Sequence, residues 1–240
     1  MTNKEIGDQL WQLYDILHGC PFCKNLDGLS AASSRCLNNL KEDFWHFEIP
    51  NLLFSIDKKV DKLQVAPNHI DDIELEFYIK AKGKIGSFEV DEYDFNLVIT
   101  GWFINNESSA IEKAICCWHL DWHPHLGNSI LDDVLMHPKY HFQHGGKKIK
   151  GYESKLGNTF VMASPRIAYP PMDAILGIDF ILTNFIHRDK ITSVRADSRY
   201  RRLVQEAQKN YWKPYFDAIS SSWHANQRGA ENQFFPQLIC

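Results

Sequence analysis

A short stretch of the chain, from Cys117 to His123, alternates polar and apolar residues without a break. In a β-strand successive side chains point to opposite faces, so such a stretch has one polar face and one apolar face. The polar face would carry Cys117, His119, Asp121 and His123, and the apolar face would carry Trp118, Leu120 and Trp122. This alternation is typical of an antiparallel sheet with one buried face. We therefore expect a strand over residues 114–123.

The middle of the chain predicts further strands by the same period of two. Residues 73–80 and 95–100 alternate apolar and polar side chains, and shorter segments at 140–143 and 159–163 are compatible with two more strands. The connections are too short for crossover helices, so consecutive strands should pair as an antiparallel meander.

Helices are predicted before and after this region. Thr2 and Glu5 have the spacing of a capping box, and apolar residues then recur at helical spacing as far as Leu17. Residues 172–186 are apolar on almost every side, which is typical of a buried helix. The other expected helices cover residues 29–45, 195–212 and 215–223.

Together these patterns predict an α+β fold: an antiparallel sheet of about five strands, with helices packed on one face and a helical N-terminal segment. A chain of 240 residues, 44% of them hydrophobic, can bury a sizeable core as one composite domain. We expect the N-terminal helices in residues 1–50, the sheet in 51–168, the C-terminal helices in 169–226 and a mobile tail in 227–240.

Charge and hydropathy limit the classes of partner. The formal net charge of −4 excludes a globally basic nucleic-acid-binding protein, so any such binding must be local. No apolar run approaches the ~20 residues that span a bilayer, and the polar N-terminus lacks the apolar core of a secretory signal. We expect a cytoplasmic protein with reduced cysteines and no membrane partner.

Histidines concentrate around the alternating stretch, with six of the eleven lying in residues 119–144. If a strand at 140–143 pairs beside it, His141 joins the polar face. Neutral imidazoles suit zinc or another divalent transition metal. We therefore predict a divalent-metal site with His119, His123 and His141 as ligands. Asp121 would act there as a ligand, an orienting group or a general base.

Other interpretations of these histidines stay open. They can form a metal-free cluster for catalysis or binding, or they can be solvated or structural, because one face of an antiparallel sheet often faces water.

Basic residues supply a second predicted feature. Lys147 and Lys148 follow the histidines in a loop, and one side of the last long helix carries Arg195, Arg199 and Arg202. Together they can hold phosphates, although a solvated face that balances acidic residues elsewhere is the alternative.

Four soft ligands near the N-terminus have the spacing of a zinc knuckle. They are His18, Cys20, Cys23 and Cys36. A structural zinc is one interpretation. Redox chemistry of the Cys-x-x-Cys pair and buried free thiols are the others.

One pattern resembles a family. His137-Pro138-x-x-His141 is followed by a basic, glycine-containing loop, by Pro165-Arg166-Ile167 and by the apolar helix through Phe180. These residues resemble uncharacterised bacterial proteins that share a His-Pro-x-x-His segment, an Arg-Ile-Pro-like loop and a helix. Ala168 stands where that proline is expected. The resemblance implies a bacterial cytoplasmic protein, and some members of the family are suspected of belonging to phage-defence gene clusters.

The first functional hypothesis is a metal-dependent hydrolase of a phosphodiester or nucleotide, with a role in bacterial defence. A metal-bound hydroxide would attack with the help of Asp121, while Lys147, Lys148 or an arginine would stabilise the phosphate. The alternative is a non-catalytic binding or regulatory subunit. It would hold a protein or nucleic acid through the polar sheet face or the basic C-terminal helix.

Overall fold

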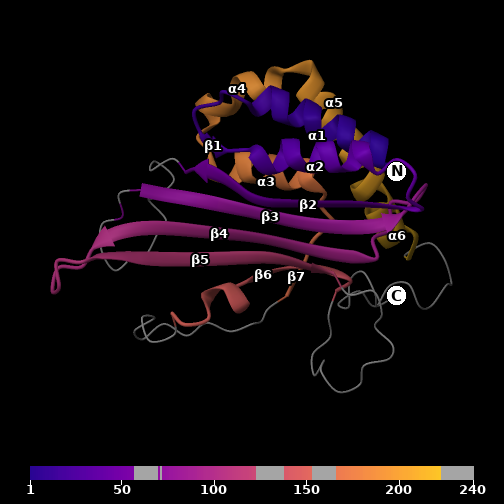
Figure 1. Ribbon diagram of the computed structural model, residues 1–240. Helices are drawn as coiled ribbons and strands as arrows, with labels where there is room; N and C mark the ends of the chain where they lie inside the picture. The colour runs from indigo at the N-terminus through magenta and orange to yellow at the C-terminus, as the bar shows by residue number, and fades with distance from the viewer. Residues whose placement is uncertain (57–69, 71, 123–137, 153–165, 223–240) are drawn as a thin grey trace.

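The structure, a computed structural model, describes residues 1–56, 70, 72–122, 138–152 and 166–222. Its centre is an antiparallel sheet of seven strands that lie in chain order (Figure 1). The strands are β1 (Cys23–Asn25), β2 (Phe44–Ser55), β3 (Asp72–Lys84), β4 (Glu92–Ile104), β5 (Ile111–Trp122), β6 (Tyr140–His144) and β7 (Ile167–Ala168).

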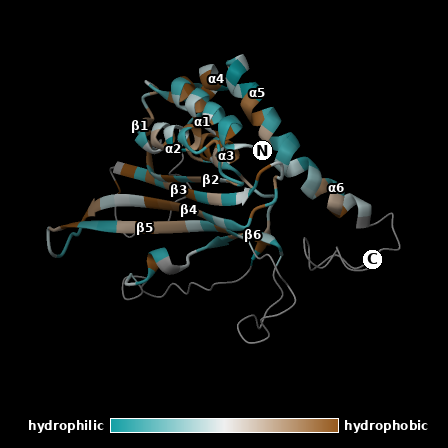
Figure 2. Ribbon diagram, turned by 45° about the vertical axis from the view of Figure 1, so that its right-hand side comes forward, coloured by the Kyte–Doolittle hydropathy of each residue, from teal (hydrophilic) through white to brown (hydrophobic). Residues whose placement is uncertain are grey.

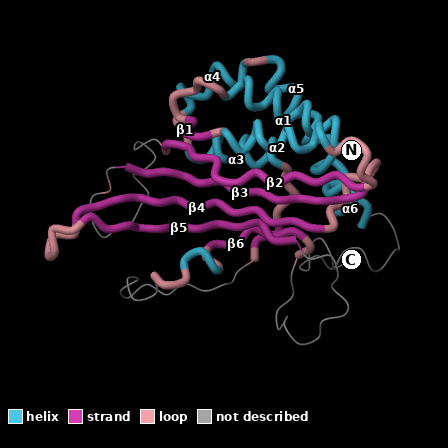
Figure 3. The backbone as a smooth tube through the Cα atoms, viewed as in Figure 1, coloured by secondary structure: helices cyan, strands magenta, loops and turns pink. Residues whose placement is uncertain are grey.

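The helices lie mostly on one side of this sheet (Figures 1 and 3). They are α1 (Asn3–Leu17), α2 (Asp27–Asn38), α3 (Ala174–Phe185), α4 (Arg188–Ala196), α5 (Ser198–Ala207) and α6 (Lys213–Ser222). A short 3₁₀ turn, η2 (Lys147–Ile149), follows β6, and a π-helical segment, η4 (Gln208–Trp212), joins α5 to α6. None of the described helices has the length and apolarity needed to cross a membrane.

The predicted α+β class, the antiparallel sheet and the capped N-terminal helix are confirmed. The side chain of Thr2 accepts from the backbone N–H of Glu5, and the Glu5 carboxylate accepts from the N–H of Thr2. The strand number was too low, because β1, β2 and β7 were not predicted. The strand expected at 159–163 and the tail at 227–240 lie outside the described residues.

Strand β2 corrects the expected helix at 29–45, which ends at Asn38, and it extends the sheet into the segment predicted as helical. From residue 44 the pattern has a period of two: Trp45, Phe47 and Ile49 are buried, whereas His46 and Glu48 point to the other face. A strand with this alternation buries all three large side chains on one face of the sheet, and this burial outweighs the helical spacing of apolar residues that predicted a helix up to residue 45.

The predicted apolar helix at 172–186 is confirmed as α3, which packs directly on the sheet. A Cβ at Gly177 would lie 2.7 Å from the ring of Phe77 on β3 and 2.8 Å from the ring of Phe95 on β4. Phe142 of β6 packs its ring 5.3 Å from that of Phe180. The core therefore lies between α3 and one sheet face, and we call this face the inner face and the opposite one the outer face.

The single helix expected at 195–212 is divided. Asp197 ends α4 and caps α5, where its side chain accepts from the N–H of Arg199. Pro214 does not end the helical region, because the π-helical segment η4 precedes it and α6 continues through it. Proline removes a backbone donor from a helix, and such irregular turns commonly accommodate that loss.

Candidate functional site

The predicted alternation along β5 is confirmed over its described part. Leu120 is buried in the core, and Trp118 and Trp122 pack against it from the inner face. His119 and Asp121 therefore lie on the outer face. His123, the third member of the predicted metal site on this strand, lies outside the described residues.

Strand β6 brings a second histidine to this face, as the sequence predicted. His141 pairs with Asp121, and Gln143 pairs with His119. Two imidazoles then converge on one carboxylate oxygen: Nε2 of His119 is 3.1 Å from Oδ2 of Asp121, and Nε2 of His141 is 3.6 Å from the same atom. We call these three residues the His–Asp–His cluster.

The three members of the cluster differ in their access to solvent. The side chain of Asp121 is 43% exposed, that of His119 is 15% exposed and that of His141 is fully buried. Nδ1 of His141 lies 3.2 Å from the carbonyl oxygen of Pro138, which can only accept, so Nδ1 carries a proton there. The carboxylate of Asp121 is thus the member of the cluster most accessible from solvent.

The environment of His119 favours its protonated form. Burial alone would lower the pKa of His119, but the hydrogen bond and negative charge of Asp121 oppose this, helped by the Gly145 carbonyl and Gln143. The result is a pKa above the usual 6.5. These partners stabilise the protonated imidazolium of His119.

The glycines after β6 hold the covering loop against His119. The N–H of Gly145 donates to the carbonyl of Cys117 at 2.8 Å. Gly146 has a φ of +86°, and a Cβ there would lie 2.8 Å from Cε1 of His119. The loop then places Lys148 near Cys117 on the outer face, where the lysine's charge opposes the rise that burial causes in the thiol pKa.

Replacing Gly146 by alanine should therefore destabilise the protein and displace His119. The left-handed φ costs about 1–2 kcal/mol for alanine, and overpacking costs roughly 1–3 kcal/mol more. Gly86 is the matched control, because its φ is +83° and nothing lies within 4 Å of the added Cβ. Urea unfolding of Gly146→Ala and Gly86→Ala would measure the difference, and equal losses would contradict the close approach.

The raised pKa of His119 also predicts how stability changes with pH. A group whose folded pKa exceeds its unfolded value near 6.5 contributes stability that is complete below that pH and is lost as the pH rises through the folded pKa. The difference in free energy of unfolding between the wild type and His119→Gln should therefore be larger at pH 5.5 than at pH 8.5. Denaturant titrations at the two pH values test this, and a difference that grows with pH would contradict it.

The predicted metal site is described only in part, because its ligand His123 lies outside the described residues. Among the described residues, no group of three His, Cys, Asp or Glu side chains is arranged to hold a metal ion.

The zinc knuckle predicted from His18, Cys20, Cys23 and Cys36 is likewise not formed. Cys23 pairs with Phe54 on β2, whereas the Cys36 thiol donates to the carbonyl of His46. Those two β2 positions differ by eight residues (54 − 46), or about 26 Å at ~3.3 Å per residue. Burial raises the pKa of Cys23 and raises that of Cys36 to about 11, which favours neutral thiols over metal-binding thiolates.

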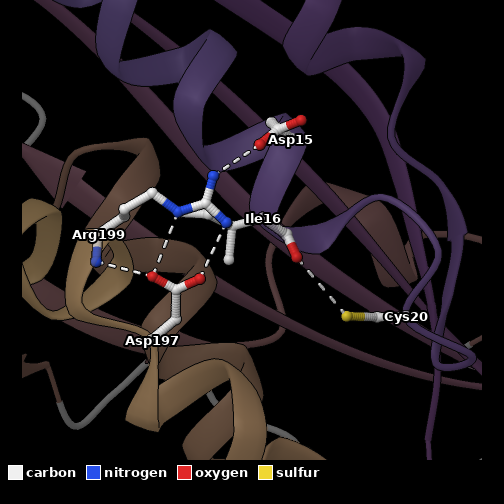
Figure 4. Close-up of polar contacts among 5 residues, drawn as sticks. All are labelled: Asp15, Ile16, Cys20, Asp197 and Arg199. Atoms are coloured by element: carbon white, nitrogen blue, oxygen red, sulfur yellow. Dashed lines mark hydrogen bonds and ion pairs between the residues drawn. The ribbon is translucent and has the colours of Figure 1, made fainter.

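The predicted phosphate-binding residues do not form one group. Arg195 lies 3.7 Å from Asp179, and Arg199 pairs with both Asp197 (3.0 Å) and Asp15 (2.8 Å) (Figure 4). These arginines, with the exposed Arg202, belong to the helical layer. Lys148 follows the loop on the outer face, and the side chain of Lys147 lies outside the described part of the structure.

Sequence reasoning missed two backbone groups that hold the cluster from outside β5. The Gly145 carbonyl contributes to the raised pKa of His119, and the Pro138 carbonyl lies 3.2 Å from Nδ1 of His141. The adjacent glycines were the available signal, since both adopt a positive φ (+95° and +86°) that favours glycine.

Comparison with known proteins adds no relative. No protein-family model, curated protein or solved structure matches this chain.

Proposed function

We propose that the protein is a hydrolase of a phosphodiester or nucleotide substrate, with the His–Asp–His cluster as its acid–base centre. One observation carries this proposal: two imidazole Nε2 atoms converge on a single oxygen of a carboxylate that is 43% exposed. A carboxylate that is held in place by buried neighbours and open on one side meets the positional requirement for a general base.

Each member of the cluster has a distinct role in this proposal. Asp121 accepts a proton from the attacking water or hydroxyl group. The protonated His119, held by Asp121 and the Gly145 carbonyl, adds positive charge beside the developing phosphorane. His141 is buried and positions the carboxylate without touching the substrate.

Lys148 provides a further cation on the same face. It is exposed, and its charge opposes the rise in the pKa of the Cys117 thiol that burial causes. Cys117 precedes His119 by two residues on the same face, a separation of roughly 6.6 Å. Asp121 lies two residues further on, roughly 13 Å from Cys117 along the strand, so in this proposal Lys148 acts on a part of the substrate remote from the scissile phosphate.

No step in this mechanism passes through a metal, because the described residues do not fit one. The metal-dependent version of the hypothesis relies on His123, which lies outside the described residues. A role in bacterial defence follows only from the family resemblance and stays a prediction.

Cleavage assays with and without metal test the proposal. Bis(4-nitrophenyl) phosphate and a mixed-sequence oligoribonucleotide serve as probes, each with EDTA or with added zinc or manganese. We expect cleavage of at least one probe that persists in EDTA. Cleavage only after metal addition would contradict the metal-free mechanism, and no cleavage under any condition would contradict the hydrolase.

The non-catalytic alternative has less support in the surfaces named for it. On the polar sheet face Lys80 pairs with Glu92 at 2.8 Å and Lys24 with Glu74 at 2.7 Å. Arg195 and Arg199 of the basic helices are paired with acidic residues as described above. Among the described residues, ion pairs thus neutralise four of the cations on these two surfaces, which weakens the support for a partner held by charge.

A further inference from the structure

Strand β5 has an edge that no described strand covers. It pairs with β4 from Ile111 to Leu120, but β6 pairs only with residues 118–122. The β4–β5 hairpin projects beyond the helical layer (Figures 1 and 3) and is partly hydrophobic towards its tip (Figure 2). Half of a long strand is thus left with a partner on one side only, within the part of the chain that the structure describes.

The direction of the backbone groups on this edge follows from one hydrogen bond. The carbonyl of Cys117 accepts from Gly145, on the β6 side. In an antiparallel strand alternate residues direct both N–H and C=O to the same side. Ile111, Lys113 and Ile115 therefore present their backbone donors and acceptors to the open edge.

The opposite side of the sheet shows how this protein covers an edge elsewhere. Along β2, Asn3 donates to the carbonyl of Phe44 and accepts from the N–H of His46. Cys36 donates to the carbonyl of His46, and Arg35 donates to that of Glu48 at 2.7 Å. Side chains from the first two helices thus satisfy the β2 edge, whereas among the described strands β6, with Gly145 directly after it, reaches β5 only at residues 117–122.

The side chains beside the open edge set the chemistry of an added strand. Ile111 is 75% exposed, and its cross-strand neighbour Ile104 is 61% exposed. Lys113 lies between Ile111 and Ile115 on the outer face, with its Nζ 6.0 Å from the ring centroid of Trp102. The edge therefore offers an apolar–cationic–apolar row.

We propose that the edge of β5 from Ile111 to Ile115 binds an extended peptide segment of a partner protein by strand addition. The segment has an acidic residue facing Lys113 and apolar residues facing the two isoleucines. Its backbone completes the hydrogen bonds of the edge, and its alternate side chains give specificity. This inference does not depend on the proposed hydrolase, whose cluster lies at the other end of β5.

A second copy of the chain is a poorer occupant of the same edge. Only one antiparallel register of β5 with its own copy uses all three edge residues, and that register sets Lys113 opposite Lys113 of the partner subunit. Like charges directly opposite each other destabilise a strand pair. The same lysine favours an acidic partner strand.

The alternative explanation is that Lys113 serves only to protect the edge, since a lysine on an open strand edge also blocks unwanted strand pairing. Two peptide probes distinguish strand addition from this protective role. They are Thr-Ile-Thr-Glu-Thr-Ile-Thr and the matched peptide with lysine in place of glutamate. Amide NMR shifts and hydrogen exchange at Ile111, Lys113 and Ile115 report binding. We expect fast exchange in the free protein and at least tenfold slower exchange when the edge is saturated with the acidic peptide.

Reversing the charge of residue 113 should reverse the preference of the edge for the acidic peptide over the lysine peptide. The acidic peptide should bind roughly two- to fivefold more tightly than the lysine peptide, and Lys113→Glu should invert this order. Slow exchange of the three amides in the free protein would overturn the proposal, because the edge would already be paired. The proposal would also be overturned if neither peptide bound or if both bound equally, because Lys113 would then serve only to protect the edge.

Proline variants separate binding from folding. The N–H of Ile115 points to the open edge, so Ile115→Pro removes no hydrogen bond within the sheet and should abolish peptide binding while the protein stays folded. Ala114→Pro is the matched control, because its N–H points to β4 and its loss should destabilise the protein markedly. Peptide binding that survives in Ile115→Pro would contradict strand addition at this edge.

Discussion

Asp121→Asn should reduce phosphodiester cleavage by about 10²–10⁴-fold while the protein remains folded. Asparagine has nearly the shape of aspartate, but its amide cannot accept a proton at neutral pH. The change also removes the negative charge that opposes the effect of burial on His119. Initial rates with bis(4-nitrophenyl) phosphate, together with a thermal melt, measure both parts of this expectation.

The matched control for this substitution is Asp217→Asn. Asp217 is an exposed carboxylate in an ion pair with Lys213 on α6, far along the chain from the cluster. Its replacement should change cleavage less than twofold, because a surface ion pair contributes about 0–1 kcal/mol and does not touch the site. Equal rates for the wild type and Asp121→Asn would show that the reaction, if present, occurs elsewhere.

Trp45→Ala should lower the free energy of unfolding by about 3–5 kcal/mol. Trp45 is fully buried, and its indole N–H donates to the carbonyl of Ser87 at 3.0 Å. Truncation creates a large cavity and also leaves that carbonyl without its donor. Urea unfolding, followed by the fluorescence of the remaining tryptophans, gives the loss.

Trp11→Ala is the control for this prediction. Trp11 is 53% exposed on α1 and stacks on Tyr14 with a centroid distance of 5.5 Å. Its truncation removes little buried area, so the expected loss is below about 1 kcal/mol. Similar losses for the two variants would contradict the placement of Trp45 in the core between the sheet and the helices.

The cluster could be predicted from the sequence because its signals are local. The period of two fixes which side chains share a face of β5, and a short neighbouring strand was enough to bring His141 beside Asp121. The sequence could not show that Nε2 of both imidazoles would approach the same oxygen of Asp121. That orientation depends on the carbonyls of Pro138 and Gly145, which only the folded backbone places.

The predictions that were wrong failed because they depend on contacts between distant parts of the chain. Residues 29–45 fit a helical spacing, and the competing strand around Trp45 is favoured by packing against distant elements such as β3. Arg199 fits a phosphate-binding helix in sequence, but its charge is used by Asp15, which lies 184 residues earlier. Contacts over such separations carry no signal in local periodicity.

The most direct test of the account is an NMR titration of the histidine rings in the wild type and in Asp121→Asn. We predict that His119 titrates above pH 6.5 in the wild type and at a lower pH in the variant. His144, whose pKa is lowered by burial and by the charge of His119, should titrate below 6.5 in the wild type. A His119 that titrates at or below 6.5, or whose pKa does not change in Asp121→Asn, would contradict the claim that this carboxylate organises the cluster.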